Sequence, residues 1–180
     1  MKKSHGEFNL TPFGTLPEAQ LFALRATVGI ENSLLKVCWN LRGPLDELIL
    51  PTRSSSPARL EGLWEKTCFE VFYKKRGSSQ YEEWNFSSSG DWAHFSFFAP
   101  RQRSSESIEV DHSTRFMLNT NLECQLEASI GLNISPMDLE FNLSCVLEHS
   151  TRAKSYWATK HGSARPDFHD SSLWLHFTSV

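Results

Sequence analysis

Alternation of apolar and polar residues is the feature that most limits what this chain can fold into. It is clearest at 35–41, 122–130 and 139–147. Because successive side chains of a strand point to opposite faces, each segment predicts a strand with one buried face and one polar face. Further strands are predicted from their aromatic and β-branched content at 21–29, 67–74, 80–86, 92–98, 114–118, 154–159 and 172–177.

The connections between these segments are rich in glycine, proline and serine, as turns require. Helical patterns are scarce. One short helix is predicted from Pro57 to about Glu65 with Ser56 as its N-cap, one turn is predicted at 135–138, and 101–113 is predicted to be a mobile loop. We therefore predict an all-β fold, an antiparallel β-sandwich of about ten strands with one or two short helical turns, and favour it over a barrel. A doubly wound α/β fold would need helices between the strands.

Length and composition agree with one domain over residues 1–180. The net charge of -3 is spread over interspersed acidic and basic residues, so no nucleic-acid partner is expected. Residues 1–13 show no signal-peptide pattern and no apolar run is long enough to span a membrane, which predicts a cytoplasmic protein with no membrane partner. The four cysteines form no CxxC pair, so free thiols are expected in place of a zinc or redox site.

The hairpin predicted at 80–98 contains the densest set of functional groups. One register places Trp84 and Phe86 in the core with Ala93, Phe95 and Phe97. The opposite face then gathers Tyr81, Glu83, Asn85, Trp92 and His94, which could stack on a sugar ring and bind its hydroxyls. A slip of one residue would rearrange this set, and an ordinary solvated sheet face is the alternative interpretation.

Two further places could carry chemistry. Glu70 lies in an apolar strand, where a carboxylate either faces solvent or is held by a partner such as Arg or Lys. The loop that contains His161, Asp167 and His169 could bind a metal, but the two histidines are eight residues apart, so only the geometry of the loop could bring them together. The favoured alternative is a structured loop with Phe168 anchored in the core and Asp167 or His169 satisfying backbone donors.

Enzymatic chemistry has little support in the sequence. The chain has no GxSxG elbow, HExxH motif, P-loop or GxGxxG motif. The adjacent carboxylates Glu82 and Glu83 point to opposite faces of their strand, so they cannot work together as an acid and a base. Catalysis is therefore the least favoured class.

Three blocks of the sequence resemble one family. LWEKTCFEVF at 63–72 is similar to the LWxxTCFExF block of bacterial DOMON-like proteins, and YEEWNFSSSGDW at 81–92 is similar to their YxEFNFSPSGxW block. SYWA at 155–158, His161 and PDFH at 166–169 resemble the ending SYWALxH…PDFH. The resemblance implies a β-sandwich related to DOMON domains and to family 9 carbohydrate-binding modules, relatives of which bind sugars or heme.

The matched blocks imply a set of candidate residues: Trp64, Glu70, Tyr81, Asn85, Ser87, Trp92, Tyr156, Trp157, His161, Asp167 and His169. Trp84 and Ser88 replace a phenylalanine and a proline of the family, and Pro100-Arg101 departs from its pattern, which puts a role for Arg101 in doubt. The heme-binding relatives use methionine and histidine ligands. Met117 and Met137 lie outside the matched blocks, so we expect no cofactor and disfavour heme.

The leading hypothesis is a non-catalytic domain that binds a glycan-like or other small polar ligand through aromatic and polar side chains. A second hypothesis is an interaction module that holds a protein partner at a sheet face or edge. The third is an enzyme of unrecognised type that uses His161, Asp167 and His169.

Overall fold

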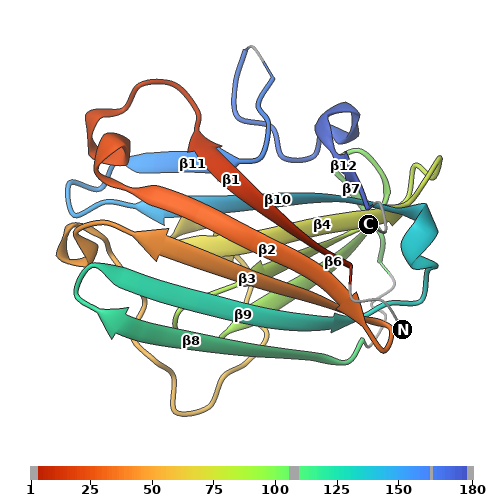
Figure 1. Ribbon diagram of the computed structural model, residues 1–180, viewed down its shortest axis with the longest axis horizontal. Helices are drawn as coiled ribbons and strands as arrows, with labels where there is room; N and C mark the ends of the chain where they lie inside the picture. Colours follow the sequence, from red (N-terminus) through yellow and green to blue (C-terminus); the bar gives the residue numbers. More distant parts are fainter. Residues whose placement is uncertain (1–3, 106–109, 163, 178–180) are drawn as a thin grey trace.

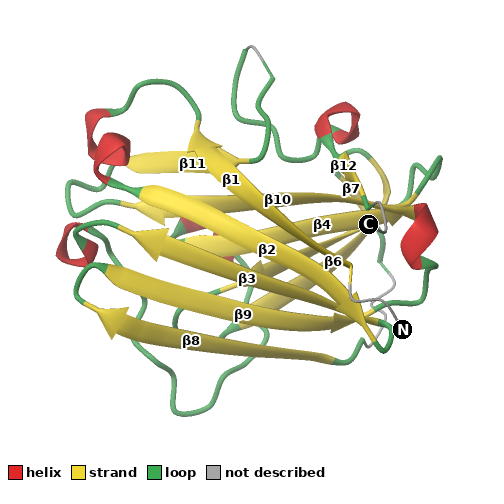
Figure 2. Ribbon diagram, in the orientation of Figure 1, coloured by secondary structure: helices red, strands yellow, loops and turns green. Residues whose placement is uncertain are grey.

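The computed structural model describes residues 4–105, 110–162 and 164–177. Over these residues the chain has an all-β fold, as predicted, with twelve strands where about ten were predicted. Its helical content is limited to short 3-10 turns in the connections (Figure 2). None of the described helices is long and apolar enough to cross a membrane. The turn predicted at 135–138 is confirmed as η4 (Pro136–Asp138), where the Ser135 hydroxyl accepts a hydrogen bond from the backbone N–H of Met137.

The strands form two antiparallel layers, and the first lies in front of the second in Figure 1. Sheet A has the order β1 (Ser4–Pro12), β2 (Ala23–Glu31), β3 (Leu34–Arg42), β9 (Glu123–Gly131) and β8 (His112–Thr120). Sheet B has the order β7 (Gln102–Arg103), β6 (Trp92–Ala99), β5 (Tyr81–Phe86), β4 (Cys68–Lys75), β10 (Leu139–Glu148) and β11 (Lys154–Ala158), with β12 (Leu175–His176) against β10.

Strand β1 joins the two layers. Most of it pairs with β2 in sheet A, and its last residues, Thr11 and Pro12, pair with β11 in sheet B. This strand was not predicted, since Gly6 and Pro12 interrupt its short apolar alternation. The sandwich is therefore continuous on the side of β1, whereas β8 and β7 end the sheets on the other side.

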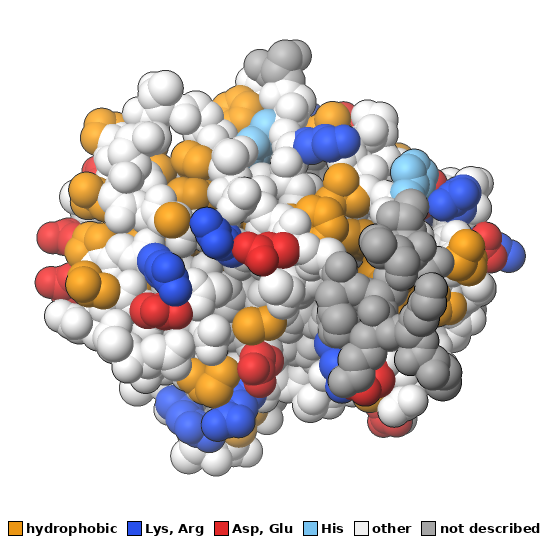
Figure 3. Space-filling model, in the orientation of Figure 1, with side chains coloured by type: hydrophobic (Ala, Val, Ile, Leu, Met, Phe, Trp, Pro, Cys, Tyr) orange, Lys and Arg blue, Asp and Glu red, His pale blue; other side chains and the backbone are white. Residues whose placement is uncertain are grey.

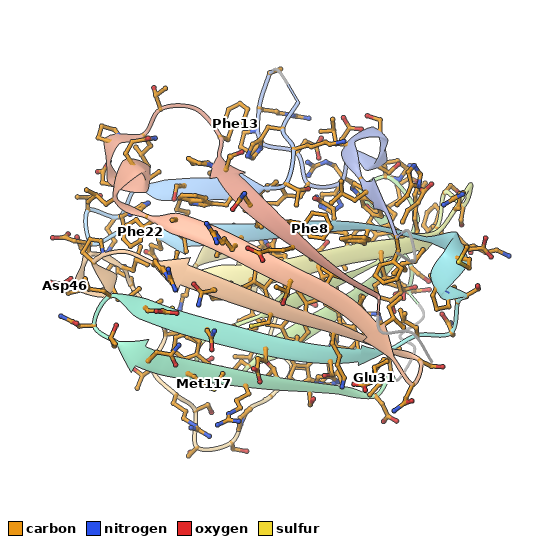
Figure 4. All side chains as sticks on the ribbon, in the orientation of Figure 1. Phe8, Phe13, Phe22, Glu31, Asp46 and Met117 are labelled. Carbon is orange, nitrogen blue, oxygen red and sulfur yellow. The ribbon has the colours of Figure 1, made fainter. Side chains whose placement is uncertain are left out.

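The main core lies between the sheets and follows the predicted alternation. Leu35, Val37, Trp39 and Leu41 of β3 stand opposite Ile130, Ala128, Leu126 and Cys124 of β9, and all of them are buried. From the strand that joins the layers, Phe8 extends toward β10 (Figure 4), where its ring lies 5.6 Å from that of Phe141. Burial of these side chains is the main force that holds the two sheets together.

Sheet B is also covered on its outer face, which sheet A is not. Phe72, Tyr81, Ala93, Phe95, Phe97 and Trp174 form a second buried cluster there, and Leu63, Trp64 and Phe168 pack against it. Strand β10 is consequently buried at every residue. The outer face of sheet A instead carries interspersed acidic and basic side chains in contact with solvent (Figure 3).

The predicted helix from Pro57 to Glu65 is wrong apart from its last turn, η3 (Leu63–Glu65). The backbone of Ala58 and Leu60 bonds to Trp92 at the start of β6, so these residues are held in an extended arrangement. Gly62 then adopts a positive φ of 78°, which a right-handed helix does not allow. The predicted loop at 101–113 contains β7 and the start of β8, and its residues 106–109 lie outside the described part.

The register predicted for the hairpin of β5 and β6 is wrong by one residue. Trp84 stands opposite His94 and Phe86 opposite Trp92, whereas Glu83 stands opposite Phe95. Trp92 and His94 therefore share the inner face with Trp84. The reason is the turn at 87–91, where the backbone N–H of Ser87 bonds to the carbonyl of Asp91 and sets Phe86 opposite Trp92.

Candidate functional site

A cavity of about 350 Å³ opens on the outer face of sheet B. Its floor comes from β4, β5 and β10, and its walls come from η3, from the turn between β6 and β7, from β11 and from the loop at 166–169. The lining residues are Trp64, Glu70, Phe72, Glu83, Phe97, Arg101, Arg103, Val146, Tyr156, Pro166, Phe168 and His169.

Two carboxylates lie at the floor because of strand register. Glu70 of β4 stands opposite both Asn85 of β5 and Ser144 of β10, and Glu83 of β5 stands opposite Phe72. Glu70 and Glu83 are thus diagonal neighbours on one sheet face. Their residues are only 2% and 5% exposed, so the covering loops have removed almost all of their contact with bulk water.

Neutral groups hold both carboxylates. The Ser144 hydroxyl donates to Glu70 Oε2 at 2.8 Å, and Asn85 Nδ2 donates to Glu83 Oε1 at 2.7 Å. The Cys68 thiol donates to Asn85 Oδ1 at 3.4 Å and extends this chain of hydrogen bonds. Among the described residues, no lysine or arginine forms an ion pair with Glu70 or Glu83. Glu70 is therefore neither solvent-facing nor held by a cation, contrary to both alternatives considered for it.

Burial determines the charge of this pair. It raises the pKa of Glu70 to about 8, with the negative charge of Glu83 as a second cause, and the Ser144 hydrogen bond opposes the rise. Burial also raises the pKa of Glu83, against the hydrogen bond from Asn85. At neutral pH Glu70 is consequently mostly protonated.

His169 lies beside the pair as a neutral imidazole. The Tyr81 hydroxyl accepts from the backbone N–H of Arg101 at 3.0 Å and shares a hydrogen bond of 2.7 Å with His169 Nδ1. The other ring nitrogen, Nε2, lies 3.8 Å from Glu83 Oε2. Burial lowers the pKa of His169 to about 4, and the positive charge of Arg101 adds to the effect. His169 consequently presents an uncharged imidazole to the cavity.

The two arginines at the mouth have acidic partners of their own. Arg101 Nη2 lies 2.7 Å from Asp167 Oδ1, and Arg103 Nη1 lies 3.1 Å from Glu61 Oε2. The guanidinium of Arg103 also lies over the Trp64 ring, 5.0 Å from its centroid. Asp167 Oδ1 in addition accepts the backbone N–H of His169, which confirms the predicted role of Asp167 in ordering the loop.

Aromatic rings form much of the remaining wall, from Trp64, Phe72, Phe97, Tyr156 and Phe168. Phe168 is anchored against the outer cluster, in agreement with its prediction as a loop anchor. Flat apolar surfaces next to acceptors and donors match the alternating C–H and O–H groups of a sugar ring. The pocket therefore has both the apolar surfaces and the polar groups that a small polar ring requires.

The structure brings eight of the twelve predicted site residues to this pocket or its supports. Trp64, Glu70, Glu83, Tyr156 and His169 line it, while Tyr81, Asn85 and Asp167 hold the lining residues in place.

The other four predicted residues lie elsewhere. His94 is on the inner face, where its Nε2 lies 2.7 Å from Glu82 Oε2. Trp157 belongs to the main core and donates to Ser155, and His161 bonds to the carbonyl of Thr11 at the end of β1. Trp92 lines a different hollow. The register of β5 and β6 explains why His94 and Trp92 do not reach the pocket. Trp157 follows buried Ser155 by two residues, so both side chains lie on the inward side of β11.

Sequence reasoning missed the pocket residues Phe72, Phe97, Arg101, Arg103, Val146 and Pro166. Phe72 follows Glu70 by two residues, so the period of a strand could have placed it on the same face. Arg101 and Arg103 lie in a segment predicted to be mobile. Only the short strand β7, paired with β6, brings them to the pocket.

A second hollow of about 940 Å³ borders the outer edge of β8, the strand that carries Met117 (Figure 4). Trp92 lies here, with its ring 4.0 Å from that of His112. The charged lining residues are Arg53 and Arg115. The described residues contain no group of three or more His, Cys, Asp or Glu side chains that could hold a metal ion, and His161 and His169 have separate partners.

Comparison with solved structures finds relatives of the fold. A candidate carbohydrate-binding protein from Bacteroides uniformis superposes with a TM-score of 0.63 and 12% identity, over 93% of this chain and 84% of that one. A family 9 carbohydrate-binding module from Caldicellulosiruptor kristjanssonii, in complex with glucose, superposes with a TM-score of 0.58 and 13% identity, over 85% and 74%. The complex of such a module with cellotriose gives 0.56 and 12%, over 88% and 74%.

These likenesses confirm the predicted sandwich and its relation to carbohydrate-binding modules at the level of fold. No family model matches the chain, and no curated protein matches its sequence. The finer identification as a DOMON-like protein stays a prediction.

Proposed function

We propose that this protein is a non-catalytic saccharide-binding module whose site is the pocket on the outer face of sheet B. The observation that carries the proposal is the position of Glu70 and Glu83, buried at the floor of a cavity walled by aromatic rings. Polar groups at such depth cost stability unless they are satisfied, so a site that keeps them open toward a cavity is typical of ligand binding.

Each part of the pocket has a partner on a sugar. The carboxyl groups accept hydrogen bonds from ring hydroxyls, the arginine N–H groups donate to hydroxyl or ring oxygens, and the imidazole of His169 can bond to a hydroxyl group, which both donates and accepts. Trp64, only partly buried at the wall, offers an aromatic face to the C–H face of the ring. The fold supports the same assignment, because the modules described above were solved with glucose and with cellotriose.

Isothermal titration calorimetry with glucose and cellotriose tests the proposal. We expect both sugars to bind, and Trp64→Ala to weaken binding by roughly tenfold or more, which is about 1.4 kcal/mol. Trp92→Ala is the matched control, since Trp92 is also partly buried but lines the other hollow, and it is expected to leave affinity unchanged. Equal losses in the two variants, or no binding of either sugar, would contradict the proposed site.

Glycoside hydrolysis is a second candidate, favoured by one observation. Two carboxyl groups in one pocket, one of them with its pKa raised to about 8, resemble the acid and the carboxylate that glycosidases use. Prolonged incubation with cellotriose, followed by chromatography of the products, separates the two functions. A binding module leaves the trisaccharide intact, whereas glucose and cellobiose would appear if the pocket were catalytic.

A further inference from the structure

The charged side chains at the mouth of the pocket have partners of opposite charge, whereas the carboxyl groups at its floor do not. At the mouth, Arg101 is paired with Asp167 and Arg103 with Glu61. At the floor, Glu70 and Glu83 have no cationic partner among the described residues. On the same sheet face Lys74 is close, but its ammonium lies 3.1 Å from Glu140, which it neutralises. The floor of the pocket therefore holds two buried carboxyl groups, and no lysine or arginine of the described residues forms an ion pair with either of them.

Each floor carboxylate also has an oxygen that faces no donor within hydrogen-bond range in the described part of the chain. Glu70 Oε2 accepts from Ser144, and none of these residues donates to Oε1. Glu83 Oε1 accepts from Asn85, while His169 Nε2 lies 3.8 Å from Oε2, which is beyond hydrogen-bond distance. Both residues are more than nine-tenths buried and line the cavity, so a ligand in the cavity can provide donors to these two oxygens.

A protonated amine satisfies this arrangement better than a hydroxyl group does. An ammonium has three donors and a full positive charge, whereas a hydroxyl has one donor and no charge. Charge-assisted hydrogen bonds are about twice as strong as neutral ones, and an ammonium would replace the absent cation of the pair. Phe72, Phe97 and Tyr156 line the same cavity, and their rings attract a cation as well.

Resting on the proposed saccharide-binding function, we infer that the preferred ligand is an amino sugar with a free, protonated amine, which lies between Glu70 and Glu83. The neutral parent sugar and its N-acetylated form then bind more weakly. The neutral sugar lacks the charge, and the acetylated one has exchanged the ammonium for an uncharged amide with a single donor.

Calorimetry with four probes tests this inference: glucosamine, glucose, N-acetylglucosamine and cyclohexylamine, all at pH 6.5. We expect glucosamine to bind at least tenfold more tightly than glucose. Glu83→Gln keeps the shape of the side chain but removes its charge, and is expected to reduce the ratio of the two affinities to within about threefold. Glu148→Gln is the matched control, because Glu148 is a buried carboxylate of sheet B outside the pocket, and should leave the ratio unchanged.

The possible outcomes test the preference for an amine separately from saccharide binding itself. Glucose that binds as tightly as glucosamine, or a preference that survives in Glu83→Gln and in Glu70→Gln, would overturn the amine assignment and leave saccharide binding intact. Cyclohexylamine that binds when no sugar does would overturn both. If Glu83→Gln does not fold, Glu70→Gln and the series of probes on the wild-type protein still decide the question.

Discussion

The outer faces of the two sheets both carry acidic side chains, but these side chains lie in opposite environments. On sheet A, Arg25 and Glu7 are both more than half exposed and lie 3.3 Å apart in solvent. On sheet B, Glu70 and Glu83 occupy equivalent outward positions and are buried beneath η3 and the loop at 166–169. The comparison shows that an outward-facing carboxylate is solvated only where nothing covers its sheet, and that a cover of loops over such a face can enclose a pocket.

The largest effect is expected from removing a ring beneath the cover of sheet B. Phe72→Ala should lower the free energy of unfolding by about 3–5 kcal/mol, because Phe72 is 1% exposed and contacts the rings of His169 and Trp174. Thr27→Ala, on the outer face of sheet A, should change it by less than about 0.5 kcal/mol. Urea denaturation measures both. A small loss for Phe72→Ala would mean that the outer layer contributes little to stability.

A smaller effect is expected from the charge at the pocket floor, and it depends on pH. The pKa of Glu70 is raised from its ordinary 4.5 to about 8, so the folded state holds the proton more tightly than the unfolded state. This contribution is fully present below about pH 4.5 and is lost as the pH rises toward 8.

Glu70→Gln removes that dependence. Relative to the wild type, the variant should gain about 3 kcal/mol in free energy of unfolding between pH 5 and pH 8. Urea denaturation of both proteins across this pH range gives the difference between their free energies of unfolding. The contributions of the other titrating groups cancel in this difference. A difference that stays flat with pH would show that the Glu70 carboxyl is hydrated in solution, and the contrast between the two sheet faces would then fail at its central residue.

The smallest effect is expected on the outer face of sheet A. Arg25→Ala breaks the exposed pair with Glu7 and should change the free energy of unfolding by less than about 0.5 kcal/mol, with little dependence on pH. Salt at high concentration should abolish even this change, since exposed charges are screened. A larger loss would indicate that sheet A also contributes polar interactions of structural importance.

The sequence predicted features that depend on the residue pattern within one strand. It did not predict features that depend on how one strand is aligned with another. Alternation on β3 and β9 predicted which side chains meet in the core, because each strand has one apolar set. The same reasoning wrongly placed Trp92 and His94 on the face of Glu83. The predicted and the observed register of the hairpin both alternate with a period of two, so alternation alone cannot distinguish them. The turn at 87–91 decides between them, and its hydrogen bonds are not evident in a run of serines.

The sequence by itself determined the all-β class, most of the strands and the apolar sets that form the core, since these depend on the spacing of side chains along one strand. It also identified Glu70, Glu83 and His169 as candidates. Only the tertiary structure decided that Glu70 faces a cavity and that Arg101, Arg103 and His169 approach Glu83. Those contacts join residues far apart in the chain, and they depend on strand register and on which loop covers which face, neither of which a local pattern contains.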